Sequence, residues 1–293
     1  MISEEEWAVT IAAPGPGTVF VSVEVNTSVE RVWGSLTLPT VASHWFGTLS
    51  RDLAQAESAR LDFGDGDFFE LESITIAPPN LLQYDWRFLG IGPLDTITWH
   101  IEPVKRGCLV TVTDSEPERS RKAGLALREG WLDFTSRLVE FHSTGNSTRY
   151  DWRRELDVSI ELPCAAEDAW NALFALEAQS RWLPFGSVIQ TGAQAGVADN
   201  AEPRLLLLDD VDWQASPQVE FNLSCEEWEQ PTNCQMNLSA RRASALLNIS
   251  HNGWENISRD EAQQLRQRRR FCALWIEAAR RARRIIERKQ VGT

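Results

Sequence analysis

The histidines, glycines and serines of this sequence form none of the common catalytic or metal-binding patterns. The four histidines, at positions 44, 100, 142 and 251, lack the spacing of a metal site. Residues 90–93 contain two glycines but neither the third glycine nor the following helix of a phosphate-binding loop, and no Gly-x-Ser-x-Gly motif occurs. These features favour a non-catalytic protein, and we predict no catalytic residue, no metal and no cofactor.

The aromatic residues have a clearer pattern than the polar ones. Thirteen tryptophans are several times the average usage, and such large side chains build either aromatic-lined pockets or bulky cores. In residues 82–88, strand alternation places Tyr84 and Trp86 on one face and Asp85 and Arg87 on the other. If the aromatic face is turned inward, the charged face meets solvent, which is the commoner arrangement.

The elements that position these aromatic residues occur twice along the chain, at a constant offset. In the first copy, a half-buried strand at 23–25 is followed by apolar residues at helical spacing. The offset takes Trp33 to Trp170 and Trp45 to Trp182, so the separation within the tryptophan pair is the same in both copies. It continues through the later strands without a gap, and we therefore interpret the chain as a tandem duplication of a whole domain.

Each copy continues as a run of short strands and ends in a long amphipathic helix. For the first copy we predict a helix at about 119–141, a hairpin turn at 64–67, and strands at 59–63, 68–76, 82–88, 96–102 and 108–114. For the second we predict a helix at about 260–289, a loop at 192–200, and strands at 160–162, 204–208, 218–225, 233–238 and 245–251. The predicted divisions are a leader at 1–18, a first domain at 19–145, a linker at 146–152 and a second domain at 153–290.

Charge and composition narrow the classes of partner. A net charge of −13 argues against nucleic acid or an anionic membrane as the main partner. No segment has the ~20 apolar residues of a membrane span, and the start has no signal-peptide pattern. Five cysteines without a CxxC pair indicate free thiols, so we expect a cytoplasmic protein. Residues 265–289 hold ten Arg or Lys, which we interpret as the solvated face of the last helix.

A strand, two short helices, antiparallel strands and one long helix is the helix-grip order. Residues 36–47, LTLPTVASHWFG, resemble the signature of the family named after activators of the heat-shock-protein-90 ATPase, in which a proline segment leads to a Trp-Phe pair. Residues 76–86, Gly130-Trp131 and residues 251–254 resemble further segments of that family. The resemblance covers nearly the whole chain, although Leu183-Pro184 replaces the Phe-Gly of the signature in the second copy.

That resemblance places the chain in the START-like, or SRPBCC, superfamily. It implies an α+β fold of two helix-grip domains, each a curved antiparallel sheet wrapped around a long C-terminal helix, with two short helices after the first strand. The gap between sheet and helix is a natural cavity, and a mostly apolar cleft fits a small hydrophobic ligand. Fold alone does not settle function, because the superfamily includes carriers, stress proteins and resistance proteins.

Aromatic residues on the inward faces are the predicted ligand-binding residues. We expect Trp45 and Phe46 at one mouth of the first cavity, where the short helices meet the sheet. The full predicted set is Trp45, Phe46, Tyr84, Phe88, Trp86, Trp99 and Trp131 in the first copy, and Trp182, Phe221, His251 and Trp275 in the second. The alternative is that these side chains fill the space and leave a solid core.

Three functions remain open at this point. The first is non-catalytic binding of a small hydrophobic or aromatic ligand, in a carrier, sequestration, stress or resistance role. The second is a co-chaperone-like adaptor that binds a protein partner. The third is an enzyme like the polyketide aromatase/cyclases, which needs polar groups inside the cavity; Tyr84, Arg87 and His100 are candidates, but strand parity places Arg87 and His100 outside. The short linker predicts that the two domains pack on each other.

Overall fold

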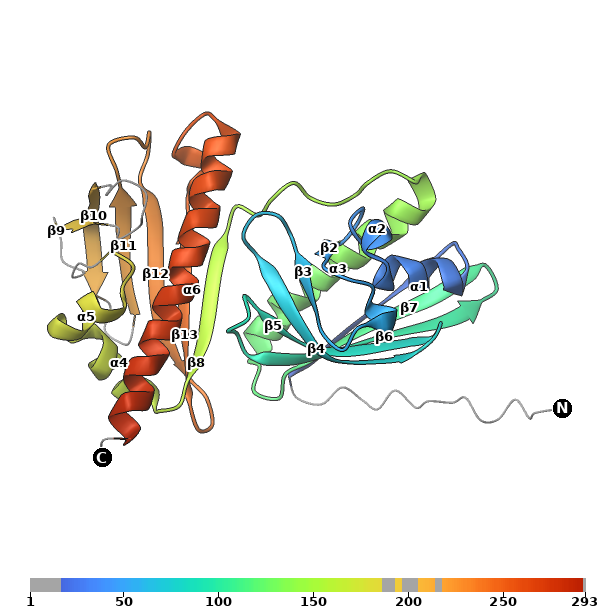
Figure 1. Ribbon diagram of the computed structural model, residues 1–293, viewed down its shortest axis with the longest axis horizontal. Helices are drawn as coiled ribbons and strands as arrows, with labels where there is room; N and C mark the ends of the chain where they lie inside the picture. Colours follow the sequence, from blue (N-terminus) through green and yellow to red (C-terminus); the bar gives the residue numbers. More distant parts are fainter. Residues whose placement is uncertain (1–16, 186–192, 197–204, 214–217, 292–293) are drawn as a thin grey trace.

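Two antiparallel sheets, each packed against one long helix, make up the computed structural model (Figure 1). The structure describes residues 17–185, 193–196, 205–213 and 218–291, so the expected leader lies almost entirely outside the described residues. The strand order is β1-β7-β6-β5-β4-β3-β2 in the first sheet and β8-β13-β12-β11-β10-β9 in the second. This is the α+β helix-grip architecture that the resemblance implies.

The first domain contains every strand and helix predicted for the first copy, with ends shifted by a few residues. Ser28 begins the first helix by accepting a hydrogen bond from the amide of Arg31, and Gly145, with a φ of 74°, ends the long one. The elements are β1 (Thr18–Val25), α1 (Val29–Thr37), α2 (Pro39–Ala42), β2 (Thr48–Leu49), η1 (Leu53–Gln55), β3 (Ala59–Asp62), β4 (Phe68–Ala77), β5 (Leu81–Phe88), β6 (Leu94–Val104), β7 (Gly107–Ser115) and α3 (Arg121–Thr144).

The second domain repeats this order without a counterpart of β2 among the described residues, and it differs from the prediction in two places. The strand expected at 204–208 is longer, because it continues to Trp213. The loop expected at 192–200 is wrong in part, because Ala193–Gly196 forms an edge strand; its sequence, Ala-Gln-Ala-Gly, lacks the apolar alternation by which a strand is recognised. The elements are β8 (Leu156–Leu162), α4 (Ala166–Phe174), α5 (Leu176–Trp182), β9 (Ala193–Gly196), β10 (Leu205–Trp213), β11 (Gln218–Ser224), β12 (Thr232–Ala240), β13 (Ala245–Asn252), η2 (Trp254–Asn256) and α6 (Glu261–Val291).

The strand register confirms the constant offset between the copies. Leu82 on β5 pairs with Trp99 on β6, and Val219 on β11 pairs with Met236 on β12. The shift from Leu82 to Val219 equals the shift from Trp99 to Met236, and it is the shift that relates the tryptophan pairs. The tandem duplication predicted from the sequence is therefore visible in the pairing of the strands as well as in their order.

The long helices depart from this offset. In the first domain the indole of Trp131 donates to Asp114 on β7, with 2.9 Å between Nε1 and Oδ2. The offset assigns Asp114 to His251 on β13, and Nδ1 of His251 accepts a hydrogen bond of 3.0 Å from Trp275. The same offset assigns Trp131 to Arg268, which lies about two helical turns before Trp275. The second copy therefore has seven more residues between these partners, and they are divided between the connection that contains η2 and the start of α6.

The N-terminal part of α6 contacts the first domain. Arg268, which is fully buried, donates to the carbonyl of Asp65 at 2.7 Å, to Oδ2 of Asp67 at 2.8 Å and to the carbonyl of Glu155 at 2.5 Å. Arg269 donates to the carbonyl of Gly64 in the same β3–β4 turn. In Figure 1 this turn reaches from the first domain toward α6 and β8.

Two further groups of residues join the domains. Leu89, in the turn between β5 and β6, is buried in the apolar cluster of the second domain, and Phe68, Phe88 and Ile91 pack against that cluster. On the other side, Arg241 in the β12–β13 turn pairs with Glu116 and Glu118 just after β7. The contact between the domains is therefore partly apolar and partly ionic.

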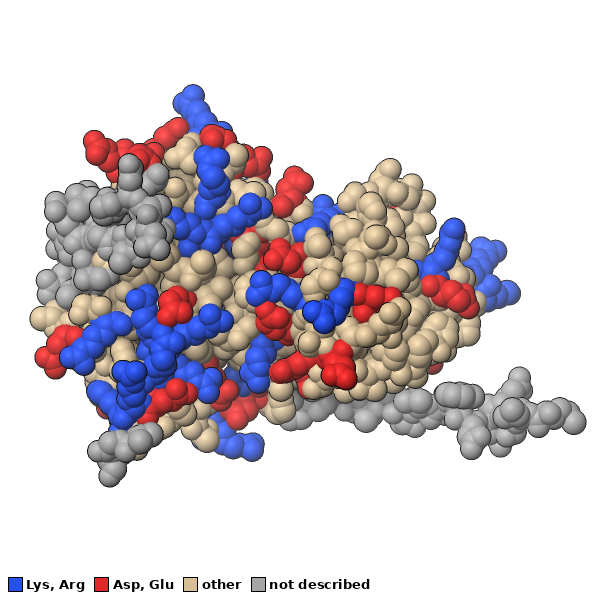
Figure 2. Space-filling model, viewed as in Figure 1, with Lys and Arg blue, Asp and Glu red and all other residues tan. Residues whose placement is uncertain are grey.

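The basic residues of α6 do not all form a solvated face. Figure 2 shows Lys and Arg side chains gathered over the C-terminal part of this helix, where Arg283 pairs with Glu287 and Arg284 with Glu277. Arg268 is the exception to our prediction, because it is buried against the first domain. No helix of the described residues combines the length and apolar character needed to cross a membrane.

Candidate functional site

A cavity of about 530 Å³ lies in the first domain, between its sheet and α3. The segment between α3 and β8, residues 145–155, joins the two domains and closes one side of this cavity. Eight of the seventeen lining residues are aromatic, and they come from the β3–β4 turn, from β4 and β5, from α3 and from the segment between the domains: Phe63, Phe69, Trp86, Phe88, Trp131, Phe134, Tyr150 and Trp152. This volume is within the range of small-molecule sites, and the aromatic wall favours a flat, apolar ligand.

Trp86 lies at the centre of the aromatic wall. Its ring stacks on Phe69, with centroids 3.7 Å apart, and on Trp131, with centroids 5.4 Å apart and planes within 12°. The indole is thus almost completely buried. Its Nε1 is buried and has no hydrogen-bond partner among the described residues. A buried donor without a partner costs about 1–3 kcal/mol, so Trp86 offers an N–H that an acceptor on a ligand would satisfy.

Asp67 is the buried carboxylate of the same wall. Its Oδ2 is bound by Arg268 at 2.8 Å and lies 3.5 Å from Arg153, both in the second domain. Its Oδ1 is buried and has no partner among the described residues. Burial raises the pKa of Asp67 to about 6, against the lowering effect of Arg268. The carboxyl group is therefore mostly ionised at neutral pH.

A second buried polar group lies behind Trp131. Asp114 accepts from the Trp131 indole and from Arg119, at 2.5 Å, and Arg119 also binds Asp95 at 3.0 Å. Burial and the nearby charge of Asp114 raise the pKa of Asp95 to about 7, and burial raises the pKa of Asp114 as well. Two carboxylates thus share one guanidinium, and both of them favour the protonated form more than an exposed aspartate does.

We expect this cluster to make stability depend on pH near neutrality. The pKa of Asp95 is higher in the folded protein than its ordinary value of 3.8. Its contribution to stability is therefore fully present below pH 3.8 and is lost as the pH rises through about 7. Lowering the pH from 8 to 6 should stabilise the protein by on the order of 1 kcal/mol through this group. Urea denaturation at both pH values measures it.

The Asp95→Asn variant should show a smaller stability gain between those two pH values than the unmodified protein. Glu129→Gln is the control, because Glu129 is an exposed carboxylate of α3. The pKa values of Asp67 and Asp114 are also raised in the folded protein, so a residual slope is expected in Asp95→Asn. An unchanged slope in that variant would show that Asp95 does not take up the proton.

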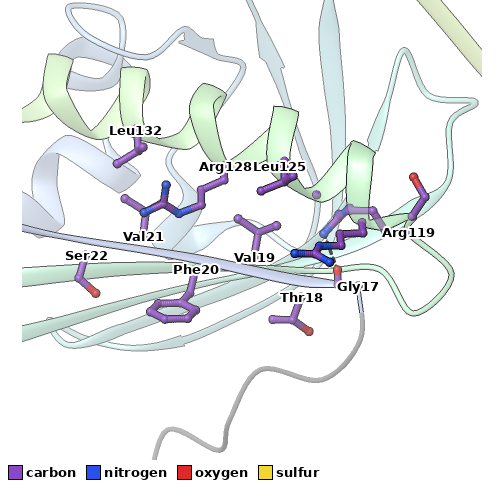
Figure 3. A pocket seen from close by; sticks show the side chains of 13 residues that line it. Gly17, Thr18, Val19, Phe20, Val21, Ser22, Arg119, Leu125, Arg128 and Leu132 are labelled. Carbon is purple, nitrogen blue, oxygen red and sulfur yellow. Dashed lines mark hydrogen bonds between the residues drawn. The ribbon is translucent and has the colours of Figure 1, made fainter.

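A groove of about 660 Å³ on the edge of the first domain is a weaker candidate. It lies between α3 and the edge strand β1 (Figure 3), where Val19 and Val21 point toward the helix and Leu125 and Arg128 lie above them. Phe20 points to the opposite side of the strand. None of the groove's lining residues contributes a buried polar atom that lacks a partner. The groove therefore offers little to select a particular ligand.

A polar cleft of about 850 Å³ separates the two domains on the side of Arg241. It is lined by charged residues of the first domain and by Asn, Ser and Asp residues of β8, β12 and β13. Its arginines, Arg119 and Arg241, are already engaged by Asp95, Asp114, Glu116 and Glu118. The cleft thus has fewer unsatisfied groups than the aromatic cavity, which we take as the candidate site.

Comparisons with known proteins agree with this fold. The family described as "Activator of Hsp90 ATPase homolog 1-like protein" (AHSA1) matches residues 26–143. The crystal structure of DynU16, a protein in the dynemicin biosynthetic locus, is 33% identical over 92% of this chain and 98% of its own, with a TM-score of 0.82. This chain belongs to the AHSA1 family. The family model falls on the first domain, which has the START-like, SRPBCC fold, and the second domain repeats its order of strands around a second long helix.

More distant solved structures match about one domain of this two-domain AHSA1 protein. MLL2253 from Mesorhizobium loti is 21% identical and covers 43% of this chain and 96% of its own, with a TM-score of 0.39. The Aha1 dimer from Colwellia psychrerythraea is 16% identical and covers 44% of this chain and 97% of its own, with a TM-score of 0.36. No curated protein matches the sequence.

Three of the predicted binding residues line the cavity of the first AHSA1-like domain: Trp86, Phe88 and Trp131. Trp45 and Phe46 do not, and their expected place at a mouth is wrong. Trp45 is fully buried and its indole donates to the carbonyl of Ser35 at 3.0 Å, so the short helices pack these rings into the core.

Tyr84 and Trp99 also lie in the core of the first AHSA1-like domain. Both are buried, and the Trp99 indole donates to the Tyr84 hydroxyl at 3.0 Å. Neither belongs to the cavity wall. Because the two polar atoms pair with each other, these residues require no ligand, and their role is to fill the space between sheet and helix.

The predicted residues of the second domain lie in its core, and they line none of the three cavities described above. Trp182, Phe221, His251 and Trp275 are fully buried. Phe185 lies perpendicular to Trp275 with centroids 5.3 Å apart. The His251 ring lies 2.7 Å from the Thr232 hydroxyl and accepts from Trp275, and burial holds its pKa well below the usual range. Both ring nitrogens are engaged within the protein, so His251 is a neutral structural residue.

Sequence reasoning missed Asp67 and several rings of the cavity. Phe134 lies on the apolar stripe of α3, and the helical spacing of that stripe could have identified it as an inward residue. Tyr150 and Trp152 lie in the predicted linker, where no periodicity marks an inward residue. Asp67 was interpreted only as part of a hairpin turn. Asp67, Tyr150 and Trp152 line the cavity because the folded chain brings their loops against it, and no local sequence pattern indicates this.

The polar residues proposed for a cyclase-like enzyme lie mostly outside. The side chains of Arg87 and His100 are 40% and 29% exposed on the outer face of the sheet, as strand parity predicts. Asp67 is the buried carboxylate inside the cavity wall. Among the described residues, no group of three His, Cys, Asp or Glu side chains could hold a metal ion.

Proposed function

We propose that this protein binds a small, flat aromatic molecule in the cavity of its first domain. The observation that carries the proposal is the buried indole N–H of Trp86, which lacks a partner among the described residues and lies in a wall of eight aromatic side chains. A core that serves stability alone rarely leaves such a donor unpaired. An oxygen or nitrogen acceptor on an aromatic ligand would pair with it while the ring covers the apolar wall.

The role we propose is carriage or sequestration without catalysis. DynU16 is described as a protein in a biosynthetic locus, and its similarity over almost the whole chain supports a ligand that is a biosynthetic small molecule. The second domain would then support the first. Its Arg153 and Arg268 contribute to the wall of the first cavity or hold that wall in place.

The experiment is a fluorescence and thermal-shift titration with naphthalene derivatives that carry one oxygen acceptor. We expect saturable quenching of tryptophan fluorescence and a rise in the unfolding temperature. Trp86→Phe keeps the stacked ring but removes the donor, and it should weaken binding about three- to tenfold. Trp33→Phe is the matched control, because Trp33 on α1 does not line the cavity. The absence of binding by every probe would refute the proposal.

A further inference from the structure

Asp67 is arranged so that one oxygen is fixed and the other is free. Arg268 and Arg153, both from the second domain, approach Oδ2 at 2.8 and 3.5 Å. The backbone amide of Asp67 is bound to Oδ1 of Asp65 at 2.9 Å, so the main chain is fixed as well. Oδ1 of Asp67 remains buried and unpaired among the described residues. A carboxylate oxygen accepts strong, charge-assisted hydrogen bonds. The Oδ1 of Asp67 receives none from the residues that the structure describes.

We infer that the ligand of this cavity is a hydroxylated aromatic compound whose hydroxyl group donates a hydrogen bond to Oδ1 of Asp67. The inference rests on the proposed function and specifies the chemical class of the ligand. Asp67 and Trp86 line the same cavity, and each has one buried polar atom without a partner among the described residues. An aryl ring with a hydroxyl and a second oxygen would supply the donor that Asp67 lacks and the acceptor that Trp86 lacks.

The surrounding charges favour a neutral donor over a cationic one. Arg268 and Arg153 lie within 4 Å of the carboxylate, and Arg137 and Arg154 also line the cavity or its rim. An ammonium group on the ligand would have to approach a carboxylate that Arg268 and Arg153 already pair with. An anionic ligand would meet the charge of Asp67 itself. A neutral hydroxyl avoids both repulsions and satisfies the free oxygen.

The second domain determines which oxygen of Asp67 is free. Arg268 lies in the first third of α6, and Arg153 lies just before β8. Both take Oδ2, so the cavity presents Oδ1 only while the two domains are in contact. The specificity of the site in the first domain therefore depends on the second domain.

The test compares three probes of similar shape on the full-length protein at neutral pH: 2-naphthol, 2-methoxynaphthalene and 2-naphthylmethylammonium. Methylation removes the donor and keeps the acceptor oxygen. We expect 2-naphthol to bind about tenfold more tightly than its methyl ether, because a hydrogen bond to a charged acceptor is stronger than an ordinary one. The ammonium probe should bind most weakly.

Asp67→Asn should reduce the preference for 2-naphthol to about twofold or less. The control is Asp133→Asn, since Asp133 lines the same cavity but is half exposed and paired with Arg137. If Asp67→Asn does not fold, the three probes on the unmodified protein decide alone. Equal binding of 2-naphthol and its ether would overturn the inference while leaving the proposed function standing. Tightest binding of the ammonium probe would also overturn it, and no binding of any probe would refute both proposals.

Discussion

Replacing Arg268 with methionine should lower the free energy of unfolding by about 3–5 kcal/mol, because the buried carboxylate of Asp67 loses its hydrogen-bonded cation and keeps only the more distant Arg153, at 3.5 Å. Arg268 has no exposed surface, and its hydrogen bonds reach the carbonyls of Asp65 and Glu155 as well as Asp67. Each of those acceptors would lose its partner inside the protein. Urea denaturation measures the change, and the neighbouring Arg266→Met, with a side chain 66% exposed, should cost less than about 1 kcal/mol.

The double variant Asp67→Asn, Arg268→Met separates the ion pair from the packing. When Asp67 is replaced with neutral asparagine, the loss of the Arg268 guanidinium no longer leaves a buried charge unpaired. The double variant should therefore be less destabilised than the sum of the two single variants by at least about 1 kcal/mol. If the two single changes in the free energy of unfolding simply add, the two side chains do not interact in solution. The ion pair between Asp67 and Arg268 would then not stabilise the contact between the domains.

Replacing Trp131 with alanine should also destabilise the protein by about 3–5 kcal/mol. This side chain is buried, stacks on Trp86 and donates to Asp114, so the change removes a large ring and unpairs a buried carboxylate oxygen. It should also abolish measurable binding of the aromatic probes, because a wall of the cavity is lost.

The control for Trp131→Ala is Leu125→Ala on the same helix. Leu125 is 59% exposed, so its replacement should cost less than about 1 kcal/mol and leave probe binding unchanged. Trp131→Phe should fall between the two, since it keeps part of the stacking but not the hydrogen bond to Asp114. If Trp131→Ala were no more destabilised than Leu125→Ala, the ring could not be the element that joins α3 to the sheet.

Much of the fold was predictable because its signals are local. Strand alternation identified residues 82–88, and three- and four-residue spacing identified the helix around Trp131. The internal repeat then indicated two copies of one order, and the register of Leu82 with Trp99 recurs at the same offset in the second sheet. These patterns depend on neighbours in the sequence, so they can be recognised without the tertiary structure.

The candidate site was predictable only in part. Trp86, Phe88 and Trp131 were identified because they lie on inward faces of regular elements. The same reasoning selected Trp45 and Trp99, which are buried away from the cavity. Parity distinguishes an inward side chain from an outward one. It does not say whether an inward ring lines a cavity or fills the core, because that depends on how closely the helix approaches the sheet.

Local periodicity and composition are sufficient to define the two helix-grip units, their order of elements and the aromatic character of the first cavity. Three features follow only from the tertiary structure. Asp67 lies in the cavity wall, Arg268 binds one of its carboxylate oxygens, and the segment between the domains closes one side of the site. Asp67 and Arg268 are far apart in the sequence and meet across the contact between the domains. Their geometry depends on how the two domains dock, and no local pattern records it.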